Sequence, residues 1–252
     1  MKKTATFRFY AELNDFLTPS QRQVTFTHEF KQNPAIKDII EALGVPHSEI
    51  DLILVNGESK DFTYQLQDQD HVAIYPVFEA MDISPLIHLR AKPLRKIQFI
   101  LDVHLGKLAR YLRLLGFDTF YERHYSDAQI IQYAVENHCI ILTRDVGLLK
   151  NKKVTHGLWV RATDPNLQIQ EIIARLNLSH QMNPFTRCLK CNGLLIRVEK
   201  FSIQEKLQPK TQRYYSEFST CKQCGKIYWG GSHYIRMQKF VDRLKESVRT
   251  NH

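Results

Sequence analysis

Long apolar runs are missing from the sequence, and this absence excludes a membrane-spanning helix. No hydrophobic stretch approaches the roughly 18 apolar residues that such a helix needs. The first six residues lead into no apolar segment of the kind that a secretory signal contains. From these absences we expect a cytoplasmic protein without a membrane partner.

Cysteine is scarce as well, with five in 252 residues, which excludes a disulfide scaffold. The overall composition is ordinary, since 43% of the residues are hydrophobic and 24% are charged. Disordered and collagen-like chains are therefore excluded. The chain is long enough to form one large core or two small ones.

The N-terminal third of the chain lacks a surplus of positive charge, and the rest of the chain has a large one. Residues 1–80 contain 7 Lys and Arg against 12 Asp and Glu, whereas residues 81–252 contain 28 against 14. The two parts carry formal charges of −5 and +14. A basic block of this size is typical of proteins that bind nucleic acid, although a basic surface that serves solubility gives the same count.

Residues 1–80 predict a small α+β domain. Alternation and helical spacing predict a strand, a strand, a helix and two strands, at 6–10, 24–27, 34–44, 52–55 and 71–76. This order resembles the ubiquitin-like fold of the small sulfur-carrier proteins, which work through a C-terminal Gly-Gly. Because this segment ends without such a pair, we expect a docking module that is separable from the rest of the chain.

The remaining chain divides into three parts by its pattern. Residues 81–96 contain two prolines and four basic residues without an apolar period, which predicts a linker. Apolar strands alternate with helices over 97–182, which predicts an α/β domain with a parallel sheet. Residues 183–252 are basic and poor in core residues, so we expect this part to need a metal to fold.

Four aspartates stand where a site in the α/β part would form. Asp102, Asp145 and Asp164 each follow a predicted strand, and Asp127 begins a helix that Ser126 is predicted to cap. Ligands collect outside the carboxyl ends of parallel strands. Clustered carboxylates suit magnesium or manganese, and in a basic protein such an ion suits phosphodiester hydrolysis.

Each aspartate also has a structural interpretation. Asp127 can be the favourable acid in the first turn of a helix, and Asp164 can be a turn residue before Pro165. Asp102 and Asp145 are harder to explain in this way, because a charge at the end of an apolar strand is costly unless it is paired.

Three basic residues are candidates for binding nucleic acid, namely Lys107, Arg110 and Arg144. Lys107 and Arg110 share one side of the first helix of the α/β part and could contact phosphates. Together with Arg113, they can equally form the solvated face of that helix, and Arg144 can serve only to neutralise Asp145.

The cysteines form the most specific motif. Cys188-x-x-Cys191 and Cys221-x-x-Cys224 each place two thiolates on a tight turn, and four thiolates in a tetrahedron form a closed structural zinc site. Redox thiols are the alternative, but that motif usually occurs as a single pair beside a helix. Cys139, in an apolar strand, is expected to be inert.

The longest motifs closely resemble the Mut-seven C-terminal RNase family, and they lie at residues 99–118, 142–145, 187–191 and 224–229. The resemblance implies a PIN-like nuclease domain over 97–182 and a zinc ribbon with a C-terminal helix over 183–252. A subgroup of the family also carries a ubiquitin-like N-terminal domain. In PIN-like nucleases, acids after the strands bind the metal, which implies magnesium or manganese at Asp102, Asp127 and Asp145, with Asp164 as a further catalytic acid.

Three functions remain open. The first is a magnesium- or manganese-dependent ribonuclease whose ribbon, held by zinc, and basic linker bind RNA. The second is an RNA-binding or docking protein that does not cleave. The third is a ubiquitin-like partner in sulfur transfer or cofactor biosynthesis, which the missing Gly-Gly disfavours. In the first two, the ubiquitin-like domain is free to bind a protein partner.

Overall fold

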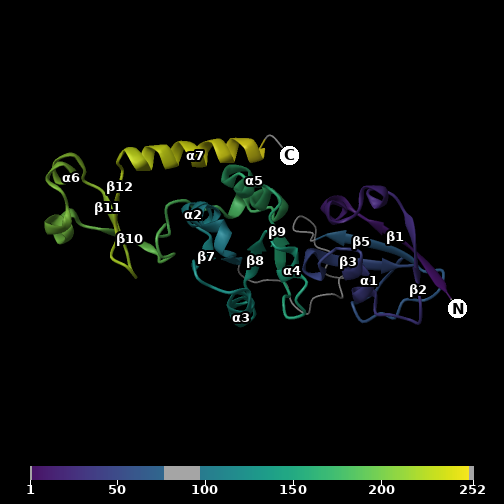
Figure 1. Ribbon diagram of the computed structural model, residues 1–252. Coiled ribbons are helices and arrows are strands. Elements are labelled where there is room, and N and C mark those ends of the chain that lie inside the picture. Colours follow the sequence, from purple (N-terminus) through teal and green to yellow (C-terminus); the bar gives the residue numbers. More distant parts are fainter. Residues whose placement is uncertain (1, 77–96, 250–252) are drawn as a thin grey trace. The chain divides into compact units, whose positions relative to one another are not determined.

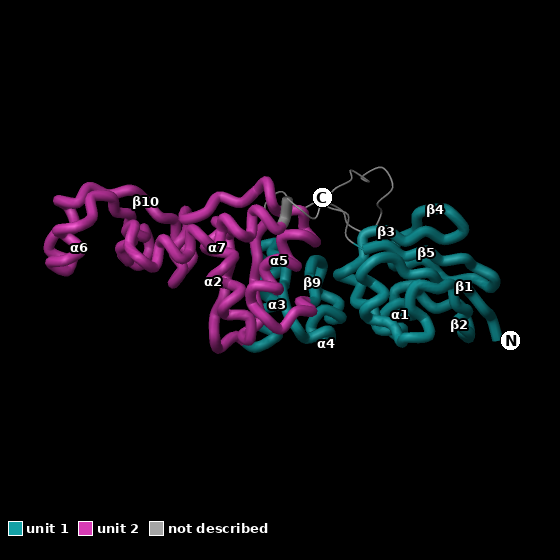
Figure 2. The backbone as a smooth tube through the Cα atoms, turned by 90° about the horizontal axis from the view of Figure 1, so that it is seen from above, with its two compact units in different colours: residues 1–96, 126–159 teal, residues 97–125, 160–252 magenta. Residues whose placement is uncertain are grey.

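The computed structural model describes residues 2–76 and 97–249 (Figure 1). The predicted linker at 81–96 lies outside these residues. The chain divides into two compact units, Met1–Lys96 with Ser126–Trp159 (unit 1) and Ile97–Tyr125 with Val160–His252 (unit 2), which Figure 2 colours separately. Among the described residues, no helix has both the length and the apolar character to span a bilayer.

The N-terminal part of unit 1 is a ubiquitin-like domain. Its strands are β1 (Lys3–Phe9), β2 (Phe26–Phe30), β3 (Ile50–Val55), β4 (Glu58–Ser59) and β5 (His71–Pro76). They form one sheet in the order β2-β1-β5-β3-β4, in which β1 is antiparallel to β2 and parallel to β5. The helices are η1 (Ala11–Phe16), η2 (Pro19–Gln21), α1 (Ile36–Ala42) and η3 (His47–Glu49).

The core of this domain forms between the sheet and α1. Alternation along β1 buries Phe7 and Phe9 completely, in one cluster with Ile40 of α1. The helix was predicted to include Pro34 in its first turn, and this was wrong. Ala35 is the N-cap, and the carbonyl oxygen of Pro34 instead accepts a hydrogen bond from the backbone N–H of Leu66 at 3.0 Å.

The α/β part contains a four-stranded sheet in the order β7-β6-β8-β9, with parallel pairs β6–β7 and β8–β9. This confirms the predicted parallel sheet. The strands are β6 (Gln98–Leu101), β7 (Asp118–Phe120), β8 (Ile140–Thr143) and β9 (Gly157–Trp159). The helices are η4 (Val103–Leu105), α2 (Gly106–Leu114), α3 (Asp127–Asn137), α4 (Val146–Leu149), α5 (Pro165–Arg175) and η5 (Ser179–Gln181).

The C-terminal part of unit 2 is a small antiparallel sheet followed by a long helix. The sheet has the order β10-β11-β12, with β10 (Leu195–Val198), β11 (Phe218–Cys221) and β12 (Ile227–Trp229). An insertion between β10 and β11 holds η6 (Lys200–Lys206) and α6 (Pro209–Tyr214). The helix α7 (Ser232–Arg249) follows, and its Phe240 ring stacks on Tyr111 of α2, with ring centroids 4.6 Å apart.

Within unit 1, the ubiquitin-like domain contacts the segment that contains α4 and β9. His47 Nε2 donates to the carbonyl oxygen of Val154 at 2.7 Å, and the buried Glu49 carboxylate accepts the backbone N–H of Trp159. The ring centroids of Phe16 and Trp159 lie 5.0 Å apart. These contacts join the N-terminal domain to the segment that contains α4 and β9. That the domain is separable from the rest of the chain stays a prediction.

Candidate functional site

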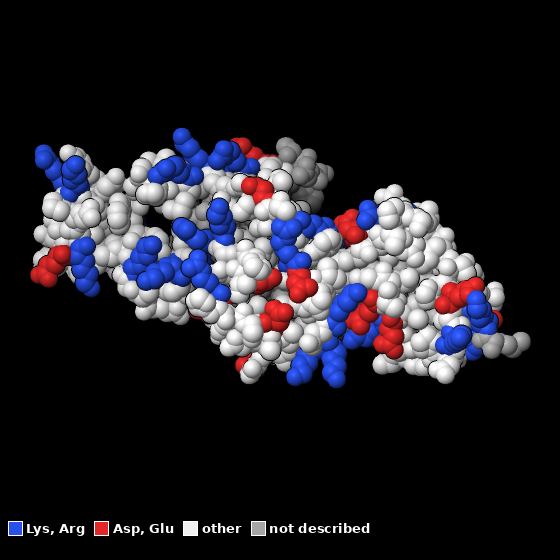
Figure 3. Space-filling view, in the orientation of Figure 1, with Lys and Arg blue, Asp and Glu red and all other residues white. Residues whose placement is uncertain are grey.

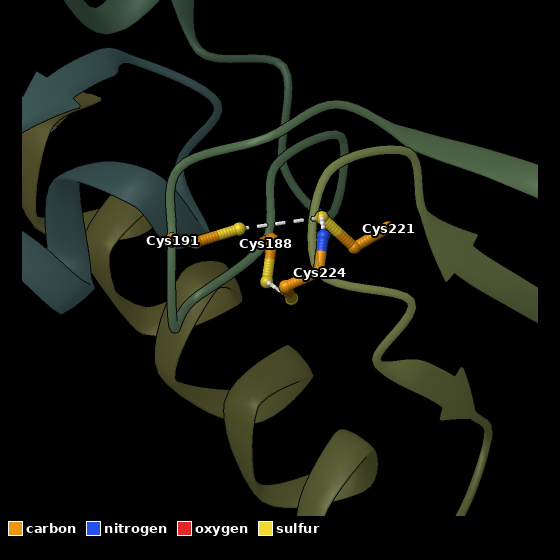
Figure 4. Close-up of side chains that lie close together, drawn as sticks. All are labelled: Cys188, Cys191, Cys221 and Cys224. Atoms are coloured by element: carbon orange, nitrogen blue, oxygen red, sulfur yellow. Dashed lines mark hydrogen bonds between the residues drawn. The ribbon is translucent and has the colours of Figure 1, made fainter.

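The four cysteines of the two Cys-x-x-Cys pairs meet in unit 2. Cys188 and Cys191 lie on the loop before β10, whereas Cys221 ends β11 and Cys224 follows it in the turn to β12. Their sulfur atoms all lie within 4.8 Å of one another. Figure 4 shows the four side chains converging from the two turns. The sequence prediction that these residues come together is confirmed.

The spacing of the sulfur atoms fits one tetrahedral ion. Cys188 Sγ lies 3.6 Å from Cys224 Sγ, and Cys191 Sγ lies 3.4 Å from Cys221 Sγ. Zinc binds thiolates at about 2.3 Å, which in a tetrahedron separates the sulfur atoms by about 3.8 Å. The cluster is thus compatible with a zinc ribbon.

Hydrogen bonds prepare one of the thiols for metal binding. Burial raises the pKa of Cys188, but hydrogen bonds from the Tyr228 hydroxyl and from the backbone N–H groups of Cys191 and Lys190 outweigh it and lower this pKa to about 6. The Tyr228 oxygen lies 3.1 Å from Cys188 Sγ and also accepts the N–H of Leu189 at 3.1 Å. A thiolate is the form that binds metal, so Tyr228 supports the site.

A buried arginine ties the first cysteine turn to the α/β part. Arg113 of α2 is 5% exposed, so its interpretation as part of a solvated helix face was wrong. Its Nε donates to the carbonyl oxygen of Thr119 at 3.0 Å, and its Nη1 donates to that of Lys190 at 3.1 Å. Burial lowers the pKa of Arg113, and the neighbouring Cys191 and Cys188 counteract this effect.

The same turn is also fixed to β7. The side-chain oxygen of Asn192 accepts the backbone N–H of Thr119 at 3.1 Å, and its amide nitrogen donates to Asp118 Oδ1 at 2.6 Å. Asp118 Oδ2 in turn forms an ion pair with Arg187 Nη2 at 3.0 Å. The cysteine cluster is therefore built onto the α2–β7 corner by polar side chains.

Two of the predicted acidic residues cap helices. Asp145 follows β8 and accepts the backbone N–H of Gly147 at 2.7 Å, which begins α4. Asp164 accepts the N–H of Asn166 at 2.8 Å and begins α5. Hydrogen bonds from the backbone N–H of Asn166, and from that of Leu167, hold the pKa of Asp164 below its ordinary value, and nearby Lys107 lowers it further. Both carboxylates are exposed.

The other two acids also stand at helix starts. Asp102 follows β6, is 7% exposed and accepts the N–H of His104 at 3.4 Å. Asp127 is exposed in the first turn of α3, where Ser126 is the predicted cap and forms a capping box with Gln129. Asp102 and Asp164 belong to unit 2, whereas the other two acids belong to unit 1. Throughout the described residues, the cysteines form the single group of three or more clustered side chains suited to a metal.

The basic candidates are solvent-accessible. Lys107 and Arg110 of α2 are exposed, as is Arg144 between β8 and α4. Sequence reasoning missed Glu171, which accepts the backbone N–H groups of Arg161 and Ala162, each at 3.1 Å. It also forms an ion pair with Arg175 at 3.6 Å. These contacts show that Glu171 holds the segment after β9 against α5.

Comparison with known protein families gives two matches. Residues 97–241, more than half of the chain, match the Mut7-C RNAse domain. Residues 2–82 match the Mut7-C ubiquitin domain. Searches of curated proteins and of solved structures found no significant match. The chain therefore belongs to the Mut7-C RNAse domain family and carries that family's ubiquitin-like domain at its N-terminus.

Proposed function

We propose that the protein is a magnesium- or manganese-dependent ribonuclease. The observation that carries the proposal is the position of its acids, in a chain whose family is named for an RNase domain. Asp102 directly follows β6, and Asp145 lies two residues after β8. The ends of parallel strands are where α/β proteins bind ligands, which supports a shared site.

The proposed ligands of the ion are Asp102, Asp127 and Asp145, with Asp164 as a further catalytic acid. Carboxylate oxygens are the ligands that these hard cations prefer. The ion would lower the pKa of a water and neutralise charge that develops on the phosphate. Lys107, Arg110 and Arg144 are exposed side chains that can bind the RNA phosphates.

We further propose that zinc is the ion of the cysteine cluster. The sulfur atoms of Cys188 and Cys224 lie 3.6 Å apart and those of Cys191 and Cys221 lie 3.4 Å apart, which suits zinc. Four thiolate ligands leave no open position on the ion for catalysis. Its function is then structural, because the small ribbon core of Ile203, Leu207 and Phe218 is too limited to order the segment alone.

A second candidate function is RNA binding without cleavage. It is favoured by one observation, which is that residues 183–252 contain 14 Lys and Arg against 5 Asp and Glu. This basic segment can bind RNA whether or not the acids bind a metal.

For the ubiquitin-like domain we propose a protein partner, and for the whole protein a cytoplasmic location.

Cleavage of RNA by the purified full chain distinguishes the two candidates. The substrates are a labelled single-stranded RNA and a structured RNA, each with and without manganese. The ribonuclease proposal predicts manganese-dependent cleavage that Asp145→Asn abolishes. Binding without cleavage, identical in the parent and the variant, would favour the second candidate.

A further inference from the structure

Exposed hydrophobic side chains gather in the ribbon segment. Most of the large ones that the described structure exposes lie here, namely Leu194, Ile196, Phe201, Tyr214, Trp229, Tyr234 and Ile235. Scattered exposed side chains need no explanation, but a local concentration marks a binding surface. Tyr214 is 69% exposed and Trp229 is 39% exposed, so neither contributes fully to a core.

Several of these rings line a single cavity within unit 2. The cavity has a volume of about 540 Å³, and β10, β11, β12 and the start of α7 contribute to its walls. Its aromatic lining consists of Phe185, Tyr214, Tyr215, Phe218, Tyr228, Trp229 and Tyr234. Ligand pockets for small molecules span about 300–1,000 Å³, so a nucleotide fits this space.

Two arginines and one acid, Arg187, Arg197 and Glu217, belong to the lining of this aromatic cavity. Arg187 is held by its ion pair with Asp118, so Arg197 is the arginine that can reach a ligand. Arg197 forms an ion pair with Glu217 at 2.7 Å, but the two side chains are 75% and 77% exposed. Exposed pairs of this kind are weak, so Arg197 is able to exchange its partner for a phosphate. In Figure 3, Lys and Arg side chains are scattered over the ribbon and α7, where few Asp or Glu side chains are visible.

We propose that this cavity, the ribbon pocket, binds an unpaired nucleotide of single-stranded RNA. Trp229 and Tyr214 offer ring faces on which a base stacks, and Arg197 offers a guanidinium for the adjacent phosphate. The inference rests on the proposed function, which it deepens by naming single-stranded RNA as the substrate class. Paired bases have no free faces to stack in such a cavity, so duplex RNA is excluded from it.

Charge complementarity favours RNA over an apolar peptide as the occupant. Residues 183–252 carry a formal charge of +9, equal to that of the whole chain. An apolar peptide would gain nothing from this charge, whereas a phosphate backbone releases counterions when it binds. Aromatic rings interleaved with arginines are the side chains that proteins use to bind single strands.

Binding is measured by fluorescence anisotropy with a labelled single-stranded oligouridylate. The protein is the full zinc-loaded chain with Asp145→Asn, so that the RNA stays intact. Adding Trp229→Leu is expected to weaken binding about tenfold, because loss of one stacked base has roughly this effect. The matched control is Phe201→Leu, which removes a ribbon ring that is 89% exposed and outside the pocket lining, and it should bind as the parent does.

Two further probes separate stacking from charge. An oligonucleotide of the same length with abasic sites should bind the parent more weakly, and Trp229→Leu should not weaken it further. Duplex RNA should bind the parent and Trp229→Leu equally. Equal loss of affinity for all three probes, or no loss for oligouridylate, would overturn the proposal.

The same experiment includes a check on folding and a direct readout. If Trp229→Leu loses zinc, Tyr214→Leu replaces it, because Tyr214 is too exposed to hold the core. The protein has two tryptophans, so Trp159→Phe leaves Trp229 as the only tryptophan, whose emission is excited selectively over that of the tyrosines. Its fluorescence should be quenched by oligouridylate and unchanged by the abasic chain. A peptide pool that quenches Trp229 where oligouridylate does not would contradict the inference.

The outcomes also separate this inference from the proposed function. Base-dependent binding at Trp229 without any manganese-dependent cleavage would sustain the ribbon pocket and refute the ribonuclease. Cleavage of single-stranded RNA at the parent rate and KM by a chain with Trp229→Leu would sustain the ribonuclease and refute the ribbon pocket.

Discussion

Arg113 Nη1 donates a hydrogen bond to the carbonyl oxygen of Lys190, at 3.1 Å, between residues 77 positions apart in the sequence. The arginine projects from α2 of the α/β part, and Lys190 lies inside the first Cys-x-x-Cys turn. Both groups lie in unit 2. This contact makes the cysteine cluster an extension of the α/β part rather than an independent appendage.

Loss of this arginine is therefore expected to destabilise both parts together. Arg113→Met keeps most of the buried side-chain volume but leaves the carbonyl groups of Thr119 and Lys190 without their donor. We expect the free energy of unfolding to fall by about 2–4 kcal/mol. Denaturant unfolding measures it. Arg110→Met, on the same helix but exposed, is the control and should change stability by less than about 0.5 kcal/mol.

Removal of the bound metal should unfold the ribbon first. If zinc holds the four cysteines, the purified protein contains one zinc ion per chain, and a strong chelator makes residues 183–249 protease-sensitive. Cys191→Ser should abolish stoichiometric zinc, whereas Cys139→Ala, outside the cluster, should retain it. Metal analysis and limited proteolysis provide the measurements. A metal-free chain whose ribbon resists protease would contradict the structural role.

Local patterns predicted much of the fold because they are written in short stretches of sequence. The cap that Ser126 forms for α3 and the strand at 71–76 are both confirmed. The convergence of the cysteine pairs was also predictable, because two Cys-x-x-Cys motifs in one chain are typical of a metal site.

Contacts between distant segments were not predictable from such patterns. A basic residue on a helix is usually solvated, and nothing near Arg113 in the sequence indicates that a cysteine turn covers it. The same holds for Tyr228, whose hydroxyl meets Cys188 only because β12 folds back beside the first turn. The sequence placed Asp145 and Asp164 after strands. Their capping hydrogen bonds were not predicted, because they depend on the backbone conformation of the turns that lead into α4 and α5.

The contact between Glu49 and Trp159 should contribute to the stability of unit 1. Glu49→Ala leaves the part-buried backbone N–H of Trp159 without this acceptor, which we expect to cost about 1–3 kcal/mol. Glu49→Gln retains an acceptor oxygen and should cost less. The exposed Glu58→Ala serves as control, and thermal unfolding gives the comparison. Equal stability of all three variants would show that this contact is dispensable.

The capping role of Asp164 predicts a different order of effects. Asp164→Ala removes the acceptor for Asn166 and Leu167 and should lower stability by about 1 kcal/mol. Asp164→Asn keeps an N-cap side chain and should cost less than about 0.5 kcal/mol. Asp127→Ala, in a first turn that Ser126 already caps, should have a smaller effect than Asp164→Ala. Denaturant unfolding at neutral pH ranks the three variants.

Asp145→Asn tests the central claim most directly, because it removes the charge of a proposed metal ligand while keeping a side chain that can cap α4. The measurement is the rate of cleavage of a labelled single-stranded RNA in manganese, together with the thermal shift that manganese causes. We predict that the parent cleaves and gains stability from manganese, and that Asp145→Asn loses both effects while its metal-free stability stays equal or rises as carboxylate repulsion falls. Cleavage at the parent rate by Asp145→Asn, with the same stabilisation by manganese, would contradict the shared-metal ribonuclease.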